Sequence, residues 1–214
     1  ELQFLGRVHS SDQAMEAINL LRQAQINFSC DLIFGLPHQR LSSFYNSLEK
    51  VIASGCQHIS FYGLSVEPNT PLYSWVKQEK VRMPDPEHYN EIYLKGVDFV
   101  EKNGMMRYEV SNFAKSGMHC KHNVAYWERL PYWGFGPGAH SFFKGKRFWV
   151  PGNLNEYLNW AKNSFPIDAL EHETLSPSDE VGEIVWLGLR TLKGLSLSKL
   201  KDYELSKFLK KANS

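Results

Sequence analysis

The feature that most constrains the fold is an alternation of helical and strand-like patterns over the first 110 residues. Apolar side chains recur at spacings of three and four residues in three segments, which predicts helices over residues 10–25, 42–54 and 86–103. Short apolar runs lie between and after them, which predicts strands over residues 30–34, 58–64 and 107–110. Strands that alternate with helices favour a parallel sheet built from right-handed crossover connections. The predicted class is therefore α/β, as an open doubly wound sheet or part of a (β/α) barrel.

Ligands bind at the carboxyl ends of the strands in both of these layouts. This places residues 35–37, 65–67 and 111–113 on the functional rim. Asp31 and Glu109 are acids within two predicted strands, and a buried carboxylate needs a hydrogen-bonding partner or a position at the open end of its strand. Each acid alone is explained equally well by a structural role. Together they favour a polar site that could bind the hydroxyl or ammonium groups of a ligand.

The chain changes character after residue 115. Residues 116–153 are rich in glycine and aromatic residues and show no helical pattern, which is more typical of a binding loop than of a linker. Further helices are predicted over residues 153–164 and from residue 176 onward. We therefore expect one domain over residues 1–170, including the loop 116–153, and the beginning of a second domain over residues 171–214.

Composition excludes several classes of function. Lys and Arg total 24 and Asp and Glu total 23, so the net charge of +1 gives no support to electrostatic binding of nucleic acid. Apolar runs are too short for a transmembrane segment. The three cysteines are too few and too scattered for a disulfide framework, which favours a reducing, cytoplasmic compartment.

A cluster of histidine and cysteine lies at residues 119–122. His119, Cys120 and His122 suggest a zinc site, but a usual zinc site needs two pairs of ligands and the sequence offers no second pair. A histidine flanked by aromatic residues could instead bind the iron of a flat macrocycle, with the rings alongside it. A loop histidine that only forms hydrogen bonds is the structural alternative.

Six motifs together resemble one known family. They are GRVH (6–9), DLIFGLPHQ (31–39), HISFYGLSVEPNTPL (58–72), YEVSNFAKSG (108–117), HNVAYW (122–127) and GFGPGAHS (134–141). In this order they resemble the radical S-adenosylmethionine proteins of the oxygen-independent coproporphyrinogen III oxidase type, and most closely the haem-chaperone branch. The resemblance covers residues 1 to about 200. It implies a partial parallel (β/α) barrel, followed by the start of a small helical C-terminal domain.

The resemblance also implies cofactors and the residues that hold them. The family binds S-adenosylmethionine, and its contacts fall on Arg7, Asp31, Ser65 and His140 of this sequence. It also implies haem binding by the HNVAYW segment, with His122 as the ligand of the haem iron and Asn123, Tyr126 and Trp127 around it. No catalytic residue is assigned.

The family's four-iron four-sulfur cluster is held by a Cys-x3-Cys-x2-Cys motif that is absent from this chain. Because thiolates hold such clusters, we expect the chain to be the C-terminal part of a longer protein that carries the cluster. The expected function is haem binding and delivery to haem-accepting proteins. The alternatives are a coproporphyrinogen III oxidase and a non-catalytic α/β binding module. Missing upstream strands would leave a sheet edge exposed, with self-association as a consequence.

Overall fold

The computed structural model describes residues 1–163 and 170–200. These residues form two compact units, which divide between His119 and Cys120. A division into compact units does not test the domain boundary that we expected near residue 170. That boundary remains a prediction.

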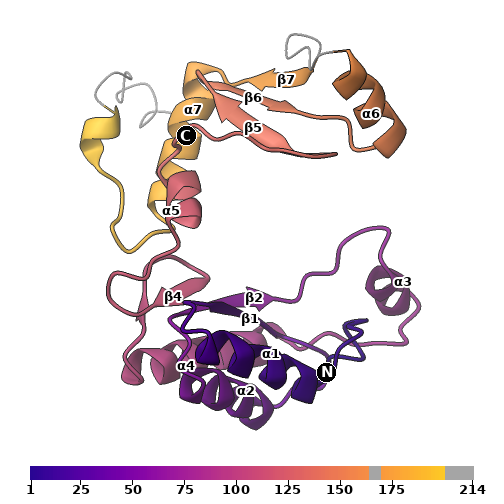
Figure 1. The fold of residues 1–214 in the computed structure, drawn as a ribbon, viewed down its shortest axis with the longest axis vertical. Helices are drawn as coiled ribbons and strands as arrows, with labels where there is room; N and C mark the ends of the chain where they lie inside the picture. Colours follow the sequence, from indigo (N-terminus) through magenta and orange to yellow (C-terminus); the bar gives the residue numbers. More distant parts are fainter. Residues whose placement is uncertain (164–169, 201–214) are drawn as a thin grey trace. The chain divides into compact units, whose positions relative to one another are not determined.

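The first unit is built on a four-stranded sheet with the order β1-β2-β4-β3. Strands β1 (Ser29–Phe34) and β2 (His58–Gly63) are parallel, as the sequence predicts. Strands β3 (Met106–Arg107) and β4 (Asn112–Ala114) are antiparallel to their neighbours. Four helices complete the unit: α1 (Ser11–Gln23), α2 (Leu41–Ala53), α3 (Pro71–Lys77) and α4 (Pro86–Lys102). Figure 1 shows α1, α2 and α4 below the sheet and α3 to one side of it.

The predicted helices of this unit are confirmed, and their ends follow from local chemistry. Ser10 caps α1, because its side chain accepts a hydrogen bond from the backbone N–H of Gln13 while the Gln13 side chain reaches back to the Ser10 N–H. Asp85 caps α4 through one such bond, since its side chain accepts from the His88 N–H, and Pro86 takes the first helical position. These caps mark where α1 and α4 begin.

One face of the first sheet packs against α2 and α4. Phe61 of β2 lies between Phe44 of α2 and Phe113 of β4, with ring centroids 5.4 and 4.4 Å away, and all three are almost fully buried. Ile59 shares this face, since it is paired with Cys30 and Phe113 in the sheet register. Because side chains alternate along a strand, the residues between these core positions point to the opposite face.

The predicted strand over residues 107–110 is wrong in extent and direction. Strand β3 ends at Arg107, the chain turns, and β4 returns antiparallel to it. The Glu109 carboxylate stabilises the turn by accepting hydrogen bonds from the Ser111 N–H, at 3.1 Å, and from the Asn112 side chain. Of the rim residues expected after this strand, 111–113, Asn112 and Phe113 therefore lie within strand β4 instead.

The second unit contains more regular structure than the sequence pattern suggested. The segment 116–153 includes a helix that we did not predict, α5 (Lys121–Trp127), and the hairpin β5 (His140–Phe143) and β6 (Lys146–Trp149). Strand β7 (Glu171–Thr174) completes this antiparallel sheet in the order β5-β6-β7. The remaining elements are α6 (Leu154–Lys162) and α7 (Pro177–Gly188), both near their predicted positions, and a short 3-10 helix (Leu197–Leu200).

Ion pairs link the elements of the second unit. Arg129, which follows α5, pairs with Glu180 at 3.1 Å and Glu183 at 2.8 Å on α7. Arg147 of β6 also pairs with Glu183, and both guanidinium groups lie over the ring of Phe142, at 5.3 and 5.7 Å from its centroid. Because these side chains are partly withdrawn from water, the pairs are screened less than surface pairs. No helix in the described ranges 1–163 and 170–200 is long and apolar enough to span a membrane.

Two helical glycines provide a test of how tightly the first unit is packed. A Cβ atom at Gly96 of α4 would lie 2.7 Å from Cε1 of the buried Phe44, whereas one at Gly182 of α7 would meet nothing within 4 Å. We expect Gly96→Ala to lower the free energy of unfolding by about 1–3 kcal/mol through overpacking. Gly182→Ala is the matched control and should raise it by about 0.5–1 kcal/mol. Chemical denaturation measures both, and equal effects would contradict the packing described here.

Candidate functional site

The face of the first sheet that points away from α2 and α4 is polar. His58 is buried there, with Nδ1 2.8 Å from Ser29 Oγ and Nε2 2.7 Å from the Tyr108 hydroxyl. The Tyr108 ring stacks on the His119 ring, with centroids 4.4 Å apart. Burial lowers the pKa of His58, and the nearby Asp31 carboxylate partly offsets this effect. The imidazole is therefore held neutral and hydrogen-bonded at both nitrogens.

Asp31 and Glu109 have environments that differ from what we expected. Asp31 lies in the middle of β1, which is an edge strand of this sheet among the described residues, and its side chain is exposed. The expectation that it is buried with a partner or lies at the open end of the strand is thus wrong. Glu109 is only 1% exposed, but it lies in the turn between β3 and β4 and not in a strand.

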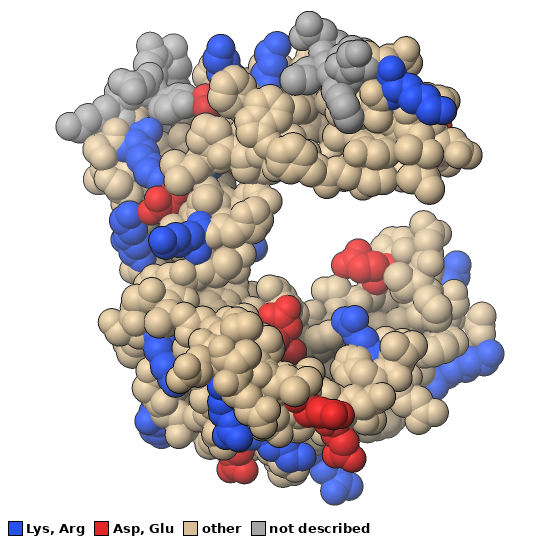
Figure 2. Space-filling model, viewed as in Figure 1, with Lys and Arg blue, Asp and Glu red and all other residues tan. Residues whose placement is uncertain are grey.

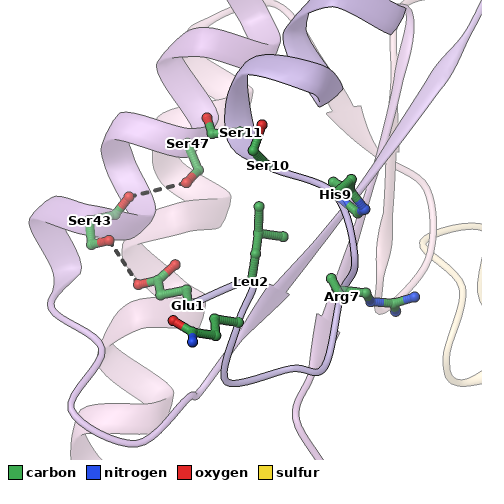
Figure 3. A pocket seen from close by; sticks show the side chains of 9 residues that line it. Glu1, Leu2, Arg7, His9, Ser10, Ser11, Ser43 and Ser47 are labelled. Atoms are coloured by element: carbon green, nitrogen blue, oxygen red, sulfur yellow. Dashed lines mark hydrogen bonds between the residues drawn. The ribbon is translucent and has the colours of Figure 1, made fainter.

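The other predicted contacts of S-adenosylmethionine are distributed over both units. Arg7 is exposed and lines a pocket of about 520 Å³ near the N-terminal end of α1, together with residues that include His9 and Ser43. Figure 3 shows the Arg7 and His9 side chains on the side of this pocket away from Ser43. Ser65 is exposed just after β2. His140 belongs to the second unit, so the structure brings only the first three predicted contacts into one unit.

His140 begins β5, and its ring lies against that of Trp149, its partner in the β5–β6 register. The centroids are 5.7 Å apart and the ring planes differ by 32°. Cross-strand ring contacts of this kind stabilise antiparallel sheets. The stability of the hairpin is therefore sufficient to explain the position of this histidine.

The HNVAYW segment forms the short helix α5, and its histidine is accessible. His122 and Tyr126 are both exposed and lie one turn apart, with ring centroids 4.7 Å apart. Tyr126 contacts Tyr132 edge to face at 4.5 Å, and Tyr132 in turn lies 6.3 Å from Phe142 of β5. A row of four rings therefore runs from the exposed imidazole to the sheet of the second unit.

The remaining two residues predicted to surround haem do not join this row. Asn123 and Trp127 are partly buried and occupy other positions on α5. Sequence reasoning missed Tyr132, which completes the row, and Arg129, which ties the end of α5 to α7. The four-residue spacing of His122 and Tyr126 is the signal that could have revealed the helix.

The cysteines of this chain do not fit an iron–sulfur cluster. The buried Cys56 donates a hydrogen bond to the His58 carbonyl at 2.7 Å, and a hydrogen bond with Cys30 lowers the pKa of Cys56 to about 7. Cys120 belongs to the other unit. Over residues 1–163 and 170–200, no group of three His, Cys, Asp or Glu side chains could hold a metal ion. A cubane cluster requires three or four protein thiolates, so the cysteines of this chain do not form a ligand set for one.

A solved structure shares the fold of this chain. In a search of solved structures, the coproporphyrinogen III oxidase HemN from Escherichia coli, described as a radical SAM enzyme, matches with a TM-score of 0.72 and 18% identity. The match covers 94% of this chain and 49% of that one. This chain therefore shares the fold of part of that protein, and the parallel pairing of β1 and β2 agrees with the predicted α/β class. No family model matches the chain.

Curated sequences give a closer relationship. The heme chaperone HemW of Synechocystis sp. is 36% identical over 93% of this chain and 49% of that protein, and HemW of Bacillus subtilis is 34% identical over 94% and 53%. The mitochondrial radical S-adenosyl methionine domain-containing protein 1 of Mus musculus is 35% identical over 94% and 42%. This chain is similar to these proteins over nearly its whole length, and it spans about half of theirs. The resemblance seen in the motifs is thus confirmed.

The misfit of the cysteines leads to a direct prediction. When this chain is reconstituted with iron and sulfide without oxygen, we expect absorbance at about 400 nm well below one cluster per chain, because the required set of thiolates is lacking. Iron and sulfide analysis of the desalted protein provides the measurement. The triple variant Cys30→Ser, Cys56→Ser, Cys120→Ser is the control and should give the same background. One cluster per chain that disappears in the triple variant would contradict the prediction.

Proposed function

We propose that this chain is part of a haem chaperone, a protein that binds haem and delivers it to acceptor proteins. The single observation that carries the proposal is the exposed His122, which stands beside Tyr126 at the end of a row of aromatic rings. The sequence relationship to curated heme chaperones from several bacteria supports it.

The geometry around His122 suits a haem ligand. A neutral imidazole is a usual axial ligand of haem iron, and an exposed ring nitrogen can approach the iron without unfolding its surroundings. Aromatic side chains beside the ligand provide flat apolar area for the macrocycle. His119 is a poorer candidate, because its ring already stacks on Tyr108. Asn123 and Trp127, which are partly buried elsewhere on α5, are further proposed haem contacts on the basis of the family resemblance.

S-adenosylmethionine is the second proposed ligand, and the first unit provides groups that suit it. Asp31 presents an exposed carboxylate that can accept hydrogen bonds from hydroxyl or ammonium groups. Arg7 can pair with a carboxylate through its fork of donors. Ser65 and His140 are further proposed contacts on the basis of the family resemblance. The cofactor supplies radical chemistry when a cluster is present, whereas these residues only bind and orient it.

The proposed setting is the cytoplasm. The three cysteines are all free thiols, as expected in a reducing compartment. Figure 2 shows Lys, Arg, Asp and Glu side chains scattered over the visible face, with no continuous area of one sign. Such a surface suits protein partners better than it suits a polyanion, which agrees with the proposed transfer of haem to acceptor proteins.

The central test is His122→Ala in the full-length protein, with haem binding followed by the Soret band. Loss of the axial ligand should raise the Kd for haem by tenfold or more and shift the band, because the bond from imidazole to iron is lost. His119→Ala and His140→Ala are matched controls, since each removes an imidazole whose ring packs against another aromatic ring. Unchanged binding in His122→Ala with loss in either control, or in Cys120→Ala, would overturn the assignment.

Enzymatic decarboxylation of coproporphyrinogen is the alternative function. The solved oxidase shares only 18% identity with this chain, so it supports the fold and not the activity. Anaerobic assay of the full-length protein for conversion of coproporphyrinogen III, together with the haem titration, separates the two functions. The chaperone proposal requires haem binding without this conversion, and conversion without haem binding would replace it.

The edge of the first sheet provides a second proposal about this chain. Strand β1 is the terminal strand of the sheet among the described residues, so one side of its backbone faces no partner strand. We expect the chain to self-associate through this edge in sedimentation velocity. A charged residue on an edge strand opposes such pairing, so Ile33→Lys should shift the population toward monomer. Ile26→Lys adds the same charge outside the strand and should not. A monomeric parent chain would contradict the proposal.

A further inference from the structure

Three polar residues occupy matching positions on three adjacent strands of the first unit. The register pairs Asp31 of β1 with Ser60 of β2, and Ser60 with Asn112 of β4. Directly paired residues point to the same face of a sheet. Their neighbours Ile59 and Phe113 pack into the core against the helices, so the three polar side chains lie together on the opposite face, where Asp31 is exposed and Ser60 and Asn112 are buried. We call Asp31, Ser60 and Asn112 the polar row.

One member of the polar row has an unused hydrogen-bonding group. Asn112 is 4% exposed, and its Nδ2 donates to Oε1 of Glu109, which is itself 1% exposed. The second Glu109 oxygen accepts from the Ser111 N–H. Because Glu109 binds the Nδ2 end of the Asn112 amide, the Oδ1 end is the free one. Among the residues that the structure describes, Asn112 Oδ1 has no hydrogen-bond partner, although buried polar atoms are nearly always satisfied.

The neighbouring row on the same face shows that unpaired groups are not general there. One step back along the strands, Ser29 and Ala114 flank His58 in the register, and both His58 nitrogens have partners, Ser29 Oγ and the Tyr108 hydroxyl. The structure therefore satisfies its own polar groups in one row and leaves an acceptor free in the next. An acceptor that is fixed in orientation but unused is typical of a position that a ligand completes.

We infer that Asp31, Ser60 and Asn112 together bind the hydrogen-bond donors of a ligand, with Glu109 as a positioning residue for Asn112. A carboxylate, a hydroxyl and an amide carbonyl all accept hydrogen bonds, so the ligand must bring donors such as vicinal hydroxyl groups or an ammonium group. The inference rests on the proposed role of Asp31 in binding S-adenosylmethionine, which carries both kinds of donor. It adds Ser60, Asn112 and Glu109 to that site.

Binding of S-adenosylhomocysteine to the full-length protein, measured by isothermal titration calorimetry, tests the inference. Ser60→Ala removes one oxygen from the polar row, and Asn112→Ala removes the free acceptor. Each should raise the Kd by about five- to tenfold, the effect of one lost hydrogen bond. Ser54→Ala is the matched control, because its equally buried hydroxyl bonds Val51 O at the end of α2, and it should leave the Kd unchanged. Melting temperatures show that each variant folds.

Adenosine and L-methionine as separate probes identify the source of the donors. If the polar row binds the ribose hydroxyls, Ser60→Ala weakens adenosine binding, and if it binds the ammonium, it weakens methionine binding. Glu109→Gln keeps an acceptor for the Asn112 amide and should retain more affinity than Glu109→Ala. In addition, Glu109→Ala should not raise the Kd further in an Asn112→Ala background, whereas a purely structural effect would add to it.

The outcomes separate the inference from the function on which it rests. If Asp31→Ala weakens S-adenosylhomocysteine binding while Ser60→Ala and Asn112→Ala do not, the polar row is wrong and the proposed cofactor site stands. If the unmodified full-length protein does not bind S-adenosylhomocysteine, the proposed cofactor site itself fails. Equal losses in Ser54→Ala and Ser60→Ala would also overturn the inference, because the effect would then reflect stability alone.

Discussion

The pairing of β1 with β2 is the interaction on which the first unit depends. This parallel register places Cys30 beside Ile59 and Asp31 beside Ser60, so a single pairing builds an apolar face and a polar face at once. The apolar face buries Phe44, Leu48 and Val51 of α2 and Ile92, Val97 and Val100 of α4. A slip of one residue would exchange the two faces and expose that core. The positions of Asp31 and Ser60 are therefore fixed by the burial of their neighbours.

Helices with regularly spaced apolar side chains were predictable from the sequence, whereas strand β3 and helix α5 were not. Helices α2 and α4 each span three or more turns, and the structure places them within one residue of the predicted limits. Strand β3 has only two residues, and its end depends on the Glu109 carboxylate, which binds residues two and three positions ahead. Helix α5 has seven residues and no buried one, so its segment shows no apolar stripe. Local chemistry decided both elements, and no stripe of apolar side chains marked either of them.

The candidate sites were predictable as residue types but not as environments. The motifs pointed to Asp31 and His122, and the structure shows both side chains exposed. What could not be read from the motifs is contact between distant segments. Tyr132 approaches Tyr126 because residues 132 and 142 bond through their backbones, at 2.9 Å in both directions, and anchor the segment after α5 to β5. Asn112 joins the row of Asp31 because of an antiparallel pairing that the predicted strand direction excluded.

The polar row and His122 belong to units with separate cores, so a substitution can disturb one of them and leave the other in place. The polar row depends on the aromatic and aliphatic core around Phe61. The ring row from His122 depends instead on Phe142 and on the ion pairs of Arg129 and Arg147 with Glu183. Removing Glu183 would leave two partly buried guanidinium groups without their shared partner, which costs more than losing an exposed pair. Such a change should disturb the surroundings of His122 while the register of β1 and β2, and with it the position of Asp31, is preserved.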